Sequence, residues 1–136
     1  MTGYERYLGV LRGGPVDHLP RLPILMAFAA KYIGSNYGAF ASDYSVLVEA
    51  NVRCAADFDF DQVSAISDPY RETAGFGARI EFVRDGVPRC PQPPLAGTKD
   101  LSVLARPQPR RSPRMLDRVR AVEEFKRRVG GRYSIL

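Results

Sequence analysis

The sequence predicts an α/β fold in which buried strands run parallel and are joined by crossover helices. Two short apolar segments, residues 22–26 and 62–66, lack the alternation of a half-exposed strand, which indicates strands buried on both faces. Residues 27–61 between them are long enough for the crossover of a βαβ unit. A third apolar segment begins at residue 133, directly after a final amphipathic helix.

The first half of the chain contains clear helix signals. Thr2 and Glu5 have the spacing of a capping box, and apolar residues follow with helical spacing until Gly13-Gly14-Pro15 ends the helix. After the strand at 22–26, residues 27–33 can form a short helix that ends at Gly34. Ser42 is the candidate cap of a longer helix that extends to about Phe58.

The second half departs from the parallel pattern before it returns to it. Residues 77–84 alternate between apolar and charged side chains, and Asp85-Gly86 is a strong signal for a hairpin turn. Residues 91–113 are interrupted by prolines, with a short helical candidate at 99–105. Residues 115–129 have the apolar spacing of an amphipathic helix, and Gly130-Gly131 follows its end.

We therefore expect one domain over residues 1–136. It divides into an N-terminal segment (1–21), the first strands and helices (22–76), a hairpin with a proline-rich loop (77–113), and a helix with the start of the next strand (114–136). Parallel strands joined by helices need helices over both faces or a closed barrel, and three strands satisfy neither. The chain is thus expected to be incomplete or to complete itself by association.

Composition narrows the class of protein. No window of about 18 uninterrupted apolar residues exists, so no membrane span is expected. The first ten residues do not resemble a secretory signal, and Cys54 and Cys90 match no metal or redox spacing. These features are typical of a cytoplasmic protein with two reduced thiols.

The net charge of +5 is concentrated in the last part of the chain. Residues 99–136 contain eleven Lys/Arg and four Asp/Glu, whereas residues 1–98 contain nine and eleven. Such asymmetry can indicate a nucleic-acid partner or simply an exposed helix. No nucleic-acid-binding motif accompanies the arginines, and Arg114, Arg118 and Arg120 lie off the apolar stripe of the last helix. We expect these arginines to form a solvated face and expect no nucleic-acid partner.

Six segments in a fixed order resemble the start of the uroporphyrinogen decarboxylase superfamily. They are residues 13–32, 58–82, 86–88, 93–95, 99–109 and 114–115. The resemblance implies a (β/α)8 barrel, here truncated after about the start of the third strand and containing an inserted hairpin. The superfamily includes the decarboxylase of haem synthesis and zinc-dependent methyltransferases that move methyl groups between corrinoid proteins and thiols.

Asp68 is the candidate catalytic residue. It follows the strand at 62–66, where barrel enzymes place their chemistry, and it matches the aspartate that faces the pyrrole N–H groups in the decarboxylase. An ionised carboxylate can accept several such hydrogen bonds and stabilise a developing cation. An aspartate before a proline is also common in turns, so a loop cap is the other interpretation.

This chain differs from the decarboxylases directly after the first predicted strand. The decarboxylases carry two carboxylate-binding arginines there, but this chain has Ala27 and Lys31, and neither replaces a planar bidentate donor. We therefore favour the methyltransferase-like branch, with candidate substrate-binding residues Met26, Phe28, Lys31 and Tyr70. The alternative is a uroporphyrinogen decarboxylase of porphyrin biosynthesis.

The resemblance also implies zinc and a corrinoid partner for the full-length parent enzyme. The zinc ligands of the family, a His-x-Cys pair and a distant cysteine, are not in this chain, so we expect no cofactor bound by residues 1–136. The isolated chain is expected to be inactive. A further alternative is a non-catalytic module completed by a homo-oligomer or by the remaining barrel half, because unpaired strand edges invite association.

Overall fold

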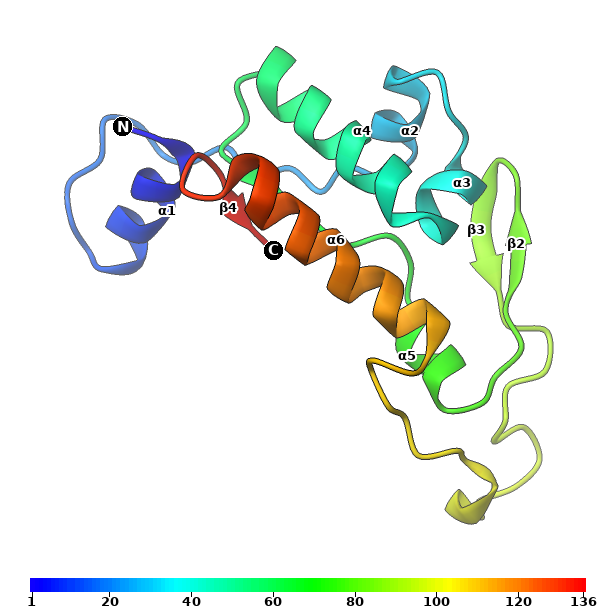
Figure 1. Ribbon diagram of the computed structural model, residues 1–136. Helices are drawn as coiled ribbons and strands as arrows, with labels where there is room; N and C mark the ends of the chain where they lie inside the picture. Colours follow the sequence, from blue (N-terminus) through cyan, green and yellow to red (C-terminus); the bar gives the residue numbers. More distant parts are fainter.

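In the computed structural model, which describes residues 1–136, the chain begins with helix α1 (Gly3–Leu11). The predicted capping box is confirmed: the amide of Glu5 donates to the Thr2 hydroxyl, and the amide of Thr2 donates to the Glu5 carboxylate. Helix α1 lies beside the C-terminal strand, and the amide of Tyr4 donates to the carbonyl of Arg132 at 3.2 Å (Figure 1). Gly3 permits a close approach, because a Cβ there would lie 2.6 Å from the Asp61 backbone.

Two parallel strands form the centre of the fold. Strand β1 (Gln62–Val63) pairs with β4 (Ser134–Ile135), and a hydrogen bond of 2.7 Å from Ala65 N to Leu136 O extends the pairing. Helix α4 (Tyr44–Asp57) precedes β1, and helix α6 (Pro113–Val129) precedes β4. The two helices run side by side over the strands (Figure 1). The strands predicted at 62–66 and from residue 133 are thus confirmed and pair in parallel, whereas the βαβ unit predicted with 27–61 as its crossover is not formed, because 22–26 joins no sheet.

The hydrophobic core lies between the strands and these two helices. Its fully buried side chains include Leu47, Cys54, Val63, Ala121 and Phe125. Burial of this apolar surface is the main favourable contribution to folding. The chain contains no helix with both the length and the apolar character needed to span a bilayer.

The predicted strand at 22–26 is wrong, because this segment has no ladder partner. Pro23 lacks an amide hydrogen, and the backbone hydrogen bond from Asp61 N to the carbonyl of Arg21 (3.0 Å) joins the residues just before each segment. Leu25 points into the core, whereas Ile24 is 63% exposed. The segment is therefore extended but belongs to no sheet.

The longer helix predicted to extend to about Phe58 is confirmed as α4, but its cap is Asp43 and not Ser42, which ends a separate short helix. Two helices occupy this region: α3 (Tyr37–Ser42), capped by Asn36, and α4, capped by Asp43. Asp43 has an extended backbone and its carboxylate accepts from the amide of Ser45 at 2.8 Å. Preceding them, α2 (Ala27–Tyr32) matches the predicted short helix.

The predicted antiparallel hairpin is confirmed between β1 and α6. Helix α5 (Arg71–Gly75) follows β1, and strands β2 (Glu81–Val83) and β3 (Gly86–Arg89) then pair with each other. The hairpin packs on α3, where the amide of Gly38 donates to the carbonyl of Arg84 at 2.7 Å. The proline-rich loop that follows contains one short 3-10 helix, η1 (Leu101–Val103), inside the predicted helical segment 99–105.

Candidate functional site

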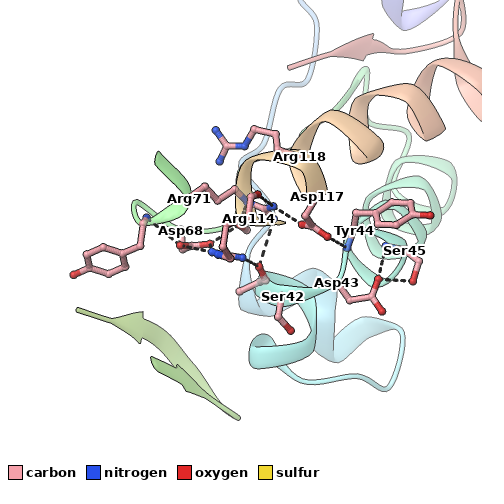
Figure 2. A network of polar contacts seen from close by, with 12 residues as sticks. Ser42, Asp43, Tyr44, Ser45, Asp68, Arg71, Arg114, Asp117 and Arg118 are labelled. Atoms are coloured by element: carbon pink, nitrogen blue, oxygen red, sulfur yellow. Dashed lines mark hydrogen bonds and ion pairs between the residues drawn. The ribbon is translucent and has the colours of Figure 1, made fainter. Parts of the chain in front are cut away.

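A buried polar network lies where the loop after strand β1 meets the first turns of helix α6 (Figure 2). We call it the Asp68 network; it consists of Ser67, Asp68, Arg71, Arg114 and Asp117. The loop after β1 supplies the first two residues, the start of α5 supplies Arg71, and α6 supplies the last two. Ligands of open α/β sheets bind outside the carboxyl ends of the strands, so this is the place where a functional site is expected.

The Asp68 carboxylate has all its acceptor positions filled. Its side chain is 0% exposed, and Nη2 of Arg114 lies 2.8 and 2.7 Å from its two oxygens. The Ser67 hydroxyl donates to Oδ2 at 2.6 Å, and the amide of Tyr70 donates to Oδ1 at 3.0 Å. Burial by itself raises the pKa of Asp68, but the hydrogen bonds from Ser67 and Arg114 outweigh burial and leave that pKa below its ordinary value.

Arg71 is the most deeply buried charge of the network. Its side chain is 0% exposed, and its Nε donates to the Ser67 hydroxyl at 3.0 Å. One Nη donates to Asp117 and to the carbonyl of Arg114, and the other donates to the carbonyl of Ala41. Burial lowers the pKa of Arg71, and the ion pair with Asp117 opposes that effect. Asp117 also accepts from the amide of Tyr44 at 2.8 Å, which ties α6 to the start of α4.

Arg114 lies on the side of the network that faces the hairpin. Besides its two bonds to Asp68, it donates to the carbonyl of Ala41 at 2.5 Å. Its guanidinium lies 4.8 Å from the ring centroid of Phe82, which is 43% exposed. Only 13% of the Arg114 side chain is exposed. Figure 2 shows Arg114 between Asp68 and Ser42, the last residue of α3.

Tyr37 joins the network from α3. Its hydroxyl donates to the carbonyl of Ser67 and lies 4.0 Å from the sulfur of Met26. Burial, followed by the nearby charge of Asp68, raises the pKa of Tyr37, so the hydroxyl remains a donor at neutral pH. Met26 thereby lies at the edge of the site.

The Asp68 network is electrically balanced, with two arginines and two aspartates. Each arginine is bound to one carboxylate, so neither is a free anion-binding group. An incoming N–H donor can reach Asp68 only by displacing one of its present donors, which are Arg114, the Ser67 hydroxyl and the Tyr70 amide. The arrangement therefore holds a fixed, ionised carboxylate that is open to a ligand only after one of these donors leaves.

Comparison with known proteins places the chain in a family. The sequence profile of uroporphyrinogen decarboxylase (URO-D) matches residues 2–136. The chain belongs to the uroporphyrinogen decarboxylase family. No curated protein matches it with significance.

Among solved structures, a methyltransferase from Methanosarcina mazei superposes with a TM-score of 0.70 at 18% sequence identity. The match covers 99% of this chain and 41% of the methyltransferase. At this identity the likeness shows the fold alone. This chain of the uroporphyrinogen decarboxylase family thus spans less than half the length of that relative.

The structure brings together some of the predicted site residues. Asp68 lies in the network, Tyr70 reaches it through its backbone amide, and Met26 lies beside Tyr37. Phe28 is 53% exposed and contacts Tyr32 and Phe58, with centroid distances of 5.9 and 5.6 Å.

Lys31 is exposed on α2 and has no ion-pair partner among residues 1–136. The structure therefore does not bring Phe28 and Lys31 into the Asp68 network. The substrate-binding roles assigned to these residues stay predictions.

Sequence reasoning missed four members of the network: Ser67, Arg71, Arg114 and Asp117. The expectation that Arg114 lies on a solvated face is wrong, because Asp68 and Ala41 draw it into the interior. One signal was present: residues 114–115 are among the segments that resemble the family. Nothing in the local sequence indicated that Arg71 would be buried.

The residues of this chain do not fit a metal ion. No group of three His, Cys, Asp or Glu side chains that could hold one exists among residues 1–136. Cys54 is buried in the core, and Cys90 is half-buried at the end of the hairpin. A ring nitrogen of His18 lies 2.9 Å from the carbonyl oxygen of Leu19. We therefore assign no role to a metal in this chain.

Proposed function

We propose that this chain is the N-terminal part of a (β/α)8 enzyme of the methyltransferase-like branch. The family match over residues 2–136 and the fold likeness to a methyltransferase support this assignment. The activity proposed for the whole enzyme is transfer of a methyl group between a corrinoid protein and a thiol. Such a transfer would replace the proton of the thiol by the methyl group of the corrinoid protein, which would keep the electron pair of its former bond to the methyl group, and the thiol proton would pass to solvent.

The observation that favours this branch over decarboxylation is the lack of a free arginine near Asp68. A polycarboxylated tetrapyrrole needs guanidinium groups to bind its carboxylates. Here Ala27 and Lys31 occupy the family's arginine positions, and Arg71 and Arg114 are each bound to an aspartate. A balanced site of this kind favours a ligand with little net charge.

Uroporphyrinogen decarboxylation remains the alternative enzymatic function. The position of Asp68 after β1 favours it, since that residue matches the family's substrate-facing aspartate. It requires one of the present donors of Asp68, such as Arg114, to leave when the substrate binds. Zinc and a corrinoid-protein partner belong to the proposed parent enzyme, and no step is assigned to zinc here because residues 1–136 do not fit it.

A non-catalytic, self-associating module is the second class of function. Its support is the exposure of large apolar side chains near the unpaired segment 22–26, with Ile24 63% and Phe28 53% exposed. A homo-oligomer or the remaining barrel half would cover them. A nucleic-acid partner is disfavoured, because several basic residues of α6 are paired with carboxylates: Arg114, Arg118, Arg127 and Arg128.

The test uses the native polypeptide. An antibody against the exposed loop at 91–112 purifies it from its source cells, and mass spectrometry gives its length and any bound chain. It is then assayed for methyl transfer from methylcobalamin to 2-mercaptoethanol and for CO2 release from uroporphyrinogen. We expect a polypeptide or complex larger than 15.1 kDa that transfers methyl groups.

Two results would overturn the proposal. One is CO2 release without methyl transfer, which would establish the decarboxylase. The other is a lone 15.1 kDa polypeptide that lacks both activities, which would favour the associating module. Residues 1–136 produced alone are expected to be inactive in both assays, since two parallel strands cannot assemble an eight-loop site.

A further inference from the structure

The Ser67 hydroxyl lies between a buried cation and a buried anion. Nε of Arg71 is 3.0 Å from Ser67 Oγ, and that oxygen is 2.6 Å from Asp68 Oδ2. A guanidinium has donors and no acceptor, so Arg71 can only donate to Ser67. The hydroxyl hydrogen must then point at Asp68, and the three groups form a chain with one hydrogen-bond direction.

We propose that Arg71 is a positioning residue that acts through Ser67 to fix Asp68 as an acceptor in a single orientation. The inference rests on the proposed role of Asp68 as the reactive carboxylate of the site. Arg71 makes no direct contact with Asp68 among its hydrogen bonds, so its effect passes through the hydroxyl.

Asp117 keeps Arg71 in the position that this requires. A buried cation without a partner is costly, and Asp117 supplies the compensating charge from α6. Asp117 is itself held by the amide of Tyr44, so the position of Arg71 is set by α4 and α6 together. Other charged groups act on the pair as well: Arg114 and Arg118 from α6 both disfavour the charge on Arg71.

Asp68 receives a second, separate stabilisation from Arg114. That contact is direct, from Nη2 alone to both carboxylate oxygens, and Arg71 reaches Arg114 only at its backbone carbonyl. The titratable groups that face Asp68 are Arg114 from α6 and Tyr37 from α3. Because Arg71 reaches Asp68 through Ser67, the effects of removing Arg71 and Ser67 on the pKa of Asp68 should be coupled and not additive in a double variant.

The experiment follows the carboxyl carbon of Asp68 by 13C NMR during a pH titration of the 136-residue chain. The variants are Ser67→Ala, Arg71→Met and the double variant, with Arg127→Met as a control on the exposed face of α6. We expect the titration midpoint of Asp68 to rise in Ser67→Ala and by the same amount in Arg71→Met. The double variant should show no further rise, and the control should match the wild type.

An unchanged midpoint in Ser67→Ala would overturn the proposal, as would a rise in Arg71→Met that adds to the rise in Ser67→Ala. If Arg71→Met does not fold, Ser67→Ala decides alone, because it removes one oxygen and no charge. The titration needs no turnover. A native enzyme that fails to transfer methyl groups therefore disproves the proposed function and leaves this inference intact.

Discussion

Removal of Arg114 should destabilise the fold in a way that depends on pH. Arg114→Met leaves Asp68 fully buried, with bonds only to the Ser67 hydroxyl and the Tyr70 amide. Removing one partner of a buried pair costs about 3–5 kcal/mol. Because Asp68 keeps two donors, we expect a loss of ~3 kcal/mol in the free energy of unfolding, a large share of the stability of a typical small domain.

The effect should shrink in acid. The folded-state pKa of Asp68 lies below the value of about 3.9 for an aspartate in the unfolded chain. The stabilisation from the ion pair is therefore fully present above that value and is lost as the pH falls through the folded-state pKa. A protonated Asp68 is neutral and does not require Arg114, so variant and wild type should converge.

Urea denaturation followed by far-ultraviolet circular dichroism measures this difference, and it is run at pH 7 and again near pH 3. Arg127→Met is the matched control, since its ion pair with Glu124 is exposed and should contribute little. A loss smaller than about 1 kcal/mol at pH 7 would contradict the assigned pairing, which predicts the cost of an unpaired buried carboxylate. So would a loss that is equal at the two pH values.

Three further predictions concern the scaffold of the site. Gly38→Ala places a Cβ 2.7 Å from the carbonyl oxygen of Val83; we expect the hairpin to move away, seen as faster amide exchange in β2 and β3 and a loss of about 1–3 kcal/mol. Phe125→Ala empties a fully buried position between α6 and α4 and should cost about 3–5 kcal/mol in urea unfolding; a loss below ~1 kcal/mol would show that Phe125 is not in the core. Thr2→Ala removes half of the capping box and should cost about 1 kcal/mol, whereas Thr2→Ser should be neutral.

The parts of the fold that could be predicted are those that depend on neighbouring residues. The capping box at Thr2, the hairpin around Asp85 and the helix before Gly130 each depend on a few adjacent side chains, and all three are present, although the hairpin turns at Arg84-Asp85 and Gly86 already belongs to β3. The segment at 22–26 has the apolar character of a buried strand. It forms none, because a strand needs a partner and that information does not lie in the segment itself.

The same reasoning applies to the site. The position of Asp68 after a buried strand was visible in the sequence, because strand ends are marked locally. Its partner Arg114 lies 46 residues away, and so does Asp117 from Arg71. A basic residue on a helix is usually solvated, and only the packing of α6 over the loop after β1 makes Arg114 an exception. Long-range pairing of this kind cannot be read from periodicity.

The contacts between the start of α5 and the start of α6 determine where the chain can tolerate insertions and deletions. Asp117 pairs with Arg71, and Arg118 pairs with Glu72, so the two ends of the long connection from α5 to α6 are held together. The hairpin and the proline-rich loop lie within this connection. Adding residues to a loop whose ends are already fixed costs little, since closure entropy grows slowly with length. Segment 90–112 is thus the place where this family member can gain or lose residues while β1 and β4 stay paired.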